Sequence, residues 1–219
     1  MSELPSNLLV VDFVADYVCP WCWIGRYRLE EALNHLRETK PDLAVRISLR
    51  PFELNPDIPP EGMERVAYAE AKFGSVERAQ AMWARVASVA AMDGLEMKFE
   101  DIGRQPNTID AHRLVAWAGT KGRGLALSAR LYPAFFREGA DLGDKDILAG
   151  LAAEVGLPRD EAAAFLASDI GVEDTRQMEE AGRRGGIDGV PVYLFNRKTS
   201  VIGAQPLDRL LEAIDQALA

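Results

Sequence analysis

The sequence predicts an α/β protein in which one discontinuous domain is interrupted by a long block of helices. Two strand-like stretches with a helix between them occupy residues 1–61, and two further strands and a helix occupy residues 185–219. The residues between these segments have helical periodicity. Two strands at each end complete one sheet only if the helices between them are inserted. We therefore expect an α/β domain of residues 1–61 and 185–219 with an inserted all-helical domain of residues 62–184.

Length and composition are those of an ordinary soluble globular protein. The 219 residues are 48% hydrophobic and 27% charged, which is compatible with one large domain or two small ones. The formal net charge of −9 argues against nucleic acid as a partner, because phosphate binding needs a basic surface. No stretch approaches the roughly 20 apolar residues of a membrane span, and no N-terminal segment has the pattern of a secretory signal. We expect a cytoplasmic protein without a nucleic-acid or membrane partner, and the sequence leaves its oligomeric state open.

The first part of the α/β domain is predicted from an apolar run and an alternating pattern. Residues 8–13 form the apolar run and indicate a buried strand. A helix over 20–37 presents leucines on one face, and residues 43–49 alternate between apolar and other side chains as a strand does. Residues 51–60 contain four prolines, which break helices and strands alike, so this stretch is the expected linker.

The helical block and the C-terminal segment are predicted from periodicity and helix ends. Asn107 is a plausible N-cap for a helix over 108–120, and Pro133 should kink or break a helix over 125–138. The C-terminal segment reads as a strand over 190–195, a turn, a second strand over 200–203 that pairs back as an edge hairpin, and a helix from 206. The helices expected in the block span 63–73, 76–93, 108–120, 125–138, 144–155, 158–167 and 172–184.

The two cysteines of the chain, Cys19 and Cys22, stand three positions apart between the first strand and the first helix. In this context a C-x-x-C pair is typical of a redox dithiol. The alternatives are two structural buried thiols or half of a zinc site. Zinc normally takes four ligands, and the sequence offers only two cysteines and two histidines, so we expect no metal.

The spacing of the two cysteines suits thiol-disulfide chemistry. At the start of a helix, Cys19 would face unpaired N–H groups and the positive end of the helix dipole, which both favour the thiolate. Pro20 suits the first helical turn, and Cys22 lies one turn on, so that both sulfurs share one side. We expect Cys19 to be the exposed nucleophile and Cys22 the buried resolving thiol. Trp21 either shapes the surface that meets a partner or packs on the sheet edge.

Four motifs stand in a characteristic order along the chain. They are Asp16-x-x-Cys19-Pro20-Trp21-Cys22-x-Ile24-Gly25, Asn107-Thr108-x-x-Ala111-His112-Arg113-Leu114, Gly189-Val190-Pro191 and Gly203-Ala204-Gln205-Pro206. Together they resemble the motifs of DsbA-type thiol-disulfide oxidoreductases, and within them the FrnE-like branch, also labelled polyketide-biosynthesis dithiol-disulfide isomerase. The resemblance implies a thioredoxin-like fold with a large inserted helical domain.

The resemblance also implies roles for residues outside the dithiol. It implies that Pro191 follows a cis peptide bond and lies against the dithiol, although X–Pro bonds are trans in most cases. The backbone of Val190 would then pair with an extended substrate segment. It further implies that Asn107 and His112 face the redox pocket, whereas His112 taken alone is a solvated or packed helix residue. The expected substrate-binding residues are Pro20, Trp21, Val190, Pro191, His112 and Asn107.

Three functions are compatible with these observations. The first is a dithiol-disulfide oxidoreductase or isomerase that acts on protein or small-thiol partners without a tightly bound cofactor, with glutathione as a candidate redox partner. The second is a glutathione-dependent isomerase or transferase of the 2-hydroxychromene-2-carboxylate isomerase or kappa-class type, families that resemble this one but keep a single serine or cysteine. The third is a non-catalytic partner-binding module. The direction of exchange stays open, since such motifs span about −270 to −120 mV.

Overall fold

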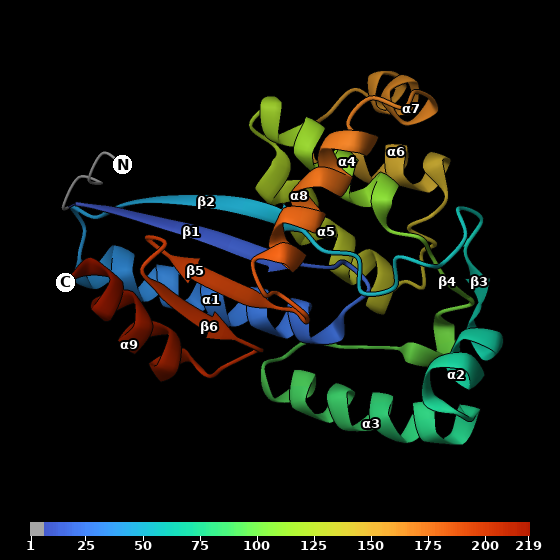
Figure 1. Cartoon of the computed structure of the whole chain (residues 1–219), viewed down its shortest axis with the longest axis horizontal. Coiled ribbons are helices and arrows are strands. Elements are labelled where there is room, and N and C mark those ends of the chain that lie inside the picture. The colour runs from blue at the N-terminus through green and yellow to red at the C-terminus, as the bar shows by residue number, and fades with distance from the viewer. Residues whose placement is uncertain (1–6) are drawn as a thin grey trace.

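The computed structural model describes residues 7–219, and its main feature is a four-stranded sheet of order β2-β1-β5-β6 (Figure 1). β1 pairs in parallel with β2 and antiparallel with β5, and β5 pairs antiparallel with β6. The first and last parts of the chain therefore complete one sheet. The strands are β1 (Leu8–Ala15), β2 (Ala44–Pro51), β5 (Val192–Phe195) and β6 (Thr199–Ile202).

Helices α1 (Pro20–Thr39) and α9 (Leu207–Leu218) pack on each other and on this sheet. β1 is buried along nearly its whole length, because both faces of this central strand are covered. Alternate β1 side chains such as Phe13 join the main core with α1. Val14 points to the other face and packs in a small cluster with Phe52.

The inserted helices gather at the end of the sheet toward which β1 and β2 run (Figure 1). α2 and α3 lie on one side of this end and α4 to α8 on the other, so the N-terminus of α1 lies where both groups meet the sheet. The helices are α2 (Arg65–Phe73), α3 (Val76–Met92), α4 (Ile109–Thr120), α5 (Gly124–Phe136), α6 (Lys145–Glu154), α7 (Arg159–Ala167) and α8 (Val172–Arg184).

Arg113 of α4 anchors the helices of the insertion to one another. Its side chain is 1% exposed, and its guanidinium donates to the carbonyl oxygens of Phe165 (3.1 Å), Leu166 (2.7 Å) and Ile170 (3.0 Å). These carbonyls lie at and just beyond the end of α7, where helical partners are missing. Asp110, one turn earlier on α4, accepts from Arg113 Nε at 2.6 Å and balances the charge.

The α/β fold with a helical insertion is confirmed, and the predicted helices and strands are present with shifted ends. The division into residues 1–61 with 185–219 and 62–184 stays a prediction. Two details differ. The insertion contains a two-residue ladder of β3 (Met63–Glu64) and β4 (Arg104–Gln105) and a short 3-10 helix, Phe99–Asp101, which are too short to give a periodic pattern. α5 also continues through Pro133 to Phe136, so the proline does not break it there.

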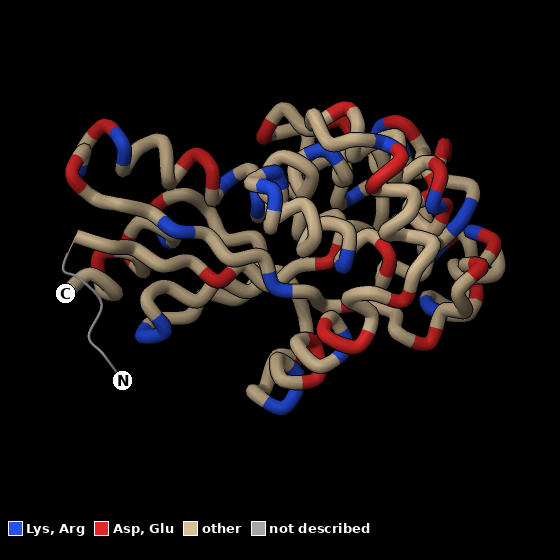
Figure 2. The backbone as a smooth tube through the Cα atoms, turned by 90° about the horizontal axis from the view of Figure 1, so that it is seen from above, with Lys and Arg blue, Asp and Glu red and all other residues tan. Residues whose placement is uncertain are grey.

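Charged residues of both signs are interspersed over the sheet and the helical part, as Figure 2 shows for the described residues. Within residues 7–219, no helix is both long and apolar enough to span a bilayer.

Candidate functional site

Cys19 and Cys22 lie at the start of α1, where the sequence places them. Cys19 is the N-cap residue with extended backbone angles (φ −93°, ψ 112°), and Pro20 is the first helical residue. The N–H of Cys22 donates to the Cys19 carbonyl oxygen at 3.0 Å, which brings the two residues onto one turn. Both thiols are free. The pKa of the Cys22 thiol lies well above its ordinary value, mainly because the thiol is buried and secondly because of its hydrogen bond with Cys19.

The expectation that Cys19 is exposed is wrong. Its exposed fraction is 2%, and that of Cys22 is 0%, so both thiols lie below the surface. Residues distant in sequence cover the helix start, which the local pattern of strand and helix does not reveal. The Cys19 Sγ donates to the Val190 carbonyl oxygen at 3.7 Å. Trp21, between the two cysteines, is instead 40% exposed and stands at the surface beside the buried pair.

The segment before β5 lies directly against the dithiol. The Val190–Pro191 peptide bond is cis, the geometry that the resemblance implies. The Pro191 carbonyl oxygen accepts from the N–H of Gly203 at 2.8 Å, which ties this segment to the end of β6. A Cβ on Gly25 of α1 would approach Pro191 Cγ to 2.9 Å. Only glycine lets α1 pack this closely beside the segment that contacts Cys19.

A buried aspartate and histidine lie behind the dithiol. Asp16 is 0% exposed, and its Oδ2 accepts from the backbone N–H of Leu54 at 2.7 Å. Its other oxygen, Oδ1, lies 3.4 Å from Nε2 of His112. His112 is 6% exposed, and its ring packs on Tyr17 with a centroid distance of 4.9 Å. The structure therefore brings His112 beside the loop that carries Cys19, as a packed residue and not a solvated one.

Two further carboxylates meet next to this pair. Glu53, which follows β2, and Glu179 of α8 are each 6% exposed. Glu179 Oε1 accepts from the Glu53 backbone N–H at 3.0 Å, and Arg183 donates to the Glu53 carbonyl oxygen at 2.6 Å and to Glu179 at 2.7 Å. Burial, together with the charges of Glu179 and Asp16, raises the pKa of Glu53 to about 7, and His112 partly offsets this shift. This cluster joins the end of β2 to α8.

α2 contributes a polar group near Cys19 that the sequence reasoning missed. Asn55 Oδ1 accepts from the Lys72 ammonium group and from the Tyr68 hydroxyl, the latter at 3.4 Å. Burial lowers the pKa of Lys72, while the charges of Asp16 and Cys19 act in the opposite direction, which places this ammonium within electrostatic range of the thiol. Asn55 stands among the prolines of the expected linker, and no local pattern marks it as part of a site.

Asn107 has a structural position in this arrangement. Its Nδ2 donates to the Ile58 carbonyl oxygen at 2.8 Å, and its Oδ1 accepts from the Ile109 N–H at 3.0 Å. The N-cap residue of α4 is Thr108, so Asn107 stands one position before the predicted place. Its side chain still accepts from the first helical N–H and holds the segment after β2 against α4. Substrate binding by Asn107, as by the other residues expected for it, stays a prediction.

The sheet order, the inserted helices and a dithiol at a helix start define a protein of the thioredoxin-like class. The family model described as "DSBA-like thioredoxin domain" matches residues 10–215. The chain therefore belongs to the DSBA-like thioredoxin domain family. This family relationship was predicted from the four motifs and is confirmed, while its FrnE-like branch stays a prediction.

Individual relatives agree with this assignment. The chain is 29% identical over 202 residues to the uncharacterized protein YwbO of Bacillus subtilis (strain 168), covering 91% of this chain and 92% of that protein. The crystal structure of a probable DsbA oxidoreductase, SCO1869 from Streptomyces coelicolor, is 31% identical with a TM-score of 0.86, covering 95% of this chain and 89% of the other. A structure of 2-hydroxychromene-2-carboxylate isomerase shares the fold at 17% identity and a TM-score of 0.70, covering 94% and 95%.

Proposed function

We propose that the protein is a dithiol-disulfide oxidoreductase or isomerase that exchanges disulfides in protein or small-thiol partners through Cys19 and Cys22. The observation that supports this proposal most directly is the contact of Cys19 Sγ with the Val190 carbonyl oxygen, beside a second thiol one helical turn away. The first thiol thus lies next to a backbone segment that can pair with an extended partner, and the second lies within reach of the first.

The exchange proceeds in two displacement steps. The Cys19 thiolate attacks one sulfur of the partner's disulfide, forms a mixed disulfide and releases the partner's other sulfur as a thiolate. The Cys22 thiol then loses its proton and attacks Cys19 Sγ, which closes the Cys19–Cys22 disulfide and releases the partner's remaining thiolate. The partner gains two electrons and the dithiol loses two. Run in reverse, the same steps oxidise a partner dithiol, and the reduction potential decides the direction.

In the second step, the attack of Cys22 on the mixed disulfide, the residues around Cys22 matter most. Because the pKa of buried Cys22 is raised, its thiol needs a proton acceptor before it can attack. The Asp16 carboxylate is buried beside it and pairs with His112 at 3.4 Å. In the proposed mechanism these two residues take part as positioning and proton-accepting groups.

Access to Cys19 sets a condition on the first step. The thiol is 2% exposed, so the partner's disulfide meets it only when the covering segment moves. The segments that come near Cys19 are the one that carries Val190 and helix α2, which carries Lys72. We propose that binding of the partner near the exposed Trp21 accompanies this opening.

The alternative of a glutathione-dependent isomerase or transferase rests on the shared fold with 2-hydroxychromene-2-carboxylate isomerase. The presence of Cys22 favours the dithiol mechanism, because a reaction on bound glutathione needs no resolving thiol. Glutathione remains a candidate small-thiol partner of the dithiol, and a cytoplasmic location fits a reducing role. The non-catalytic alternative leaves the contact between Cys19 and Val190 without a use.

The decisive experiment is replacement of the resolving thiol, Cys22→Ser. With a disulfide-containing protein such as scrambled ribonuclease, this variant should accumulate a mixed disulfide that is cleaved by dithiothreitol, whereas Cys19→Ser should accumulate none. Insulin reduction measured by turbidity should fall at least a hundredfold in both variants. Full activity of Cys22→Ser in glutathione-dependent assays would favour the isomerase or transferase alternative, and wild-type protein without any exchange activity would contradict the proposal.

A further inference from the structure

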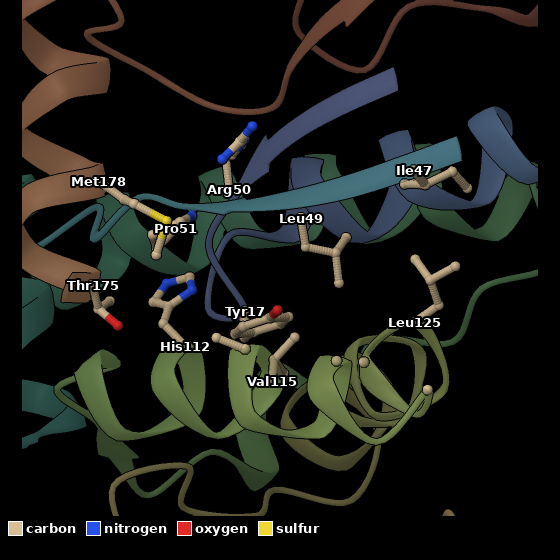
Figure 3. Close-up of a pocket in the computed structure, with 14 residues that line it drawn as sticks. Tyr17, Ile47, Leu49, Arg50, Pro51, His112, Val115, Leu125, Thr175 and Met178 are labelled. Carbon is tan, nitrogen blue, oxygen red and sulfur yellow. The ribbon is translucent and has the colours of Figure 1, made fainter. Parts of the chain in front are cut away.

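A cavity of about 390 Å³ opens between the edge strand β2 and helices α4 and α5 (Figure 3). Ile47 and Leu49 of β2 form one wall, and Val115 of α4 and Leu125 of α5 form the opposite wall. The volume lies in the range of small-molecule sites, which are typically concave and mostly apolar. Neither cysteine lines this cavity, which we call the β2–α4 slot. It is therefore separate from the place where a disulfide would react.

Part of the space in the β2–α4 slot exists because glycines line it and carry no side chains. A Cβ placed on Gly119, in the last turn of α4, would meet no atom within 4 Å. Gly122 is explained by its backbone, since its φ of +72° is a conformation that favours glycine. Gly124 is different, because its Cβ would meet the Gly119 backbone at 3.0 Å. Packing thus explains Gly124 but not Gly119, which costs helix stability relative to alanine. A bound molecule that occupies the space above Gly119 would account for the missing side chain.

His112 lies at the inner end of the β2–α4 slot, whose other polar lining residues are Tyr17, Arg50 and Thr175. The ring of His112 points from α4 into the space toward β2 and lies near Thr175 and Met178 of α8 (Figure 3). His112 is 6% exposed, and its Nε2 lies 3.4 Å from Asp16 Oδ1, toward the dithiol. The ring has a second nitrogen, Nδ1, which can donate or accept one hydrogen bond. A ligand oxygen in the slot would give this second nitrogen a partner.

We propose that the β2–α4 slot binds a small, planar and largely apolar molecule that carries one hydrogen-bonding oxygen. The ring system lies between the β2 wall of Ile47 and Leu49 and the helix wall of Val115 and Leu125, above Gly119. The oxygen lies at the inner end beside the His112 ring. Because His112 also pairs with Asp16 behind the dithiol, the occupied slot would share this histidine with the proposed proton-accepting pair.

Titration calorimetry with 2-naphthol as the probe tests this proposal on the full chain. We expect saturable one-to-one binding in the wild type and in the double variant Cys19→Ser, Cys22→Ser, since the slot does not use the thiols. Gly119→Leu fills the slot and should weaken binding at least tenfold. Gly150→Leu is the matched control, because a Cβ on this α6 glycine also meets nothing within 4 Å but lies outside the slot, and it should leave the affinity within twofold.

A second pair of measurements isolates the polar contact. His112→Leu should weaken 2-naphthol about threefold to tenfold, the range of one hydrogen bond, and leave naphthalene binding unchanged. If Gly119→Leu does not fold, Leu125→Trp blocks the slot from its half-exposed opposite wall and should have the same effect. The proposal is overturned if 2-naphthol does not bind below its solubility limit, if a folded slot-filling variant binds it as the wild type does, or if loss of the two cysteines abolishes binding.

Discussion

The contact between Gly25 and the segment before β5 predicts an unusual response to a single methyl group. In the interior of a helix, glycine to alanine ordinarily stabilises a protein by about 0.5–1 kcal/mol. At Gly25 of α1 the added Cβ would lie 2.9 Å from Pro191 Cγ and would overlap the Tyr193 hydroxyl. Tyr193 is 0% exposed, so its ring has no free space into which it can retreat. We expect Gly25→Ala to destabilise the protein.

The size of the effect follows from two opposing contributions. Inserting a methyl group into a packed core costs about 1–3 kcal/mol, and the helical gain of about 0.5–1 kcal/mol offsets part of it. The free energy of unfolding should therefore fall by about 1–2 kcal/mol. Gly150→Ala in α6 is the matched control, since its Cβ meets nothing within 4 Å, and it should raise the same quantity by about 0.5–1 kcal/mol.

Urea unfolding of a double-mutant cycle tests whether the overlap with the Tyr193 hydroxyl causes the loss of stability in Gly25→Ala. The Tyr193 hydroxyl has no hydrogen-bond partner, so Tyr193→Phe alone should leave stability unchanged or raise it. In the Gly25→Ala background the same replacement removes the overlapping oxygen and should recover most of the loss, giving a coupling of about 1 kcal/mol or more. Additive effects, within about 0.5 kcal/mol, would refute the reasoning, and so would equal behaviour of Gly25→Ala and Gly150→Ala.

Three further predictions concern charged groups. Burial and the neighbouring carboxylates raise the pKa of Glu53 from 4.5 to about 7, so the folded chain holds a proton that the unfolded chain has released, and the free energy of unfolding should fall as the pH rises from about 4.5 to about 7. Glu53→Gln should flatten this slope in urea unfolding, and an unchanged slope would assign it to another group. Arg113→Met removes the donor to the Leu166 and Ile170 carbonyl oxygens and the ion pair with Asp110, and should cost about 3–5 kcal/mol in thermal or urea unfolding, with a loss below about 1 kcal/mol contradicting its anchoring role. Lys72→Met, in the Cys22→Ser background, should slow alkylation of Cys19 by anionic iodoacetate more than by neutral iodoacetamide, whereas equal slowing would show that Lys72 acts by shape alone.

Much of the fold follows from local sequence patterns. The alternation over 43–49 and the apolar run over 8–13 predict β2 and β1, and the order of elements predicts that the C-terminal hairpin completes the sheet. The ends of the predicted strands and helices shift by only a few residues. The β3–β4 ladder is missed because two residues cannot show a period, and Pro133 is misjudged because it stands one turn before the end of α5.

The site is less accessible to such reasoning. The C-x-x-C spacing identifies Cys19 and Cys22, but the contact of Cys19 with Val190, about 170 positions away, is not visible in the local sequence. The motif residues Gly25 and Arg113 receive a physical explanation only from the structure, one from a close approach and the other from three carbonyl oxygens. The Glu53 backbone N–H donates to the Glu179 side chain, 126 positions away, and the local sequence around either residue does not predict this contact.

The concealment of Cys19 has a consequence for selectivity in a thiol-rich environment. A reactive sulfur that is covered at rest is shielded from stray peroxide and electrophiles, which act on whatever thiolate they meet. Under the proposed mechanism, a partner protein that displaces the segment carrying Val190 would reach Cys19, whereas a diffusing oxidant would not. The inactivation rate under oxidative stress would then report how often the cover opens, and would depend little on the intrinsic nucleophilicity of the sulfur beneath it.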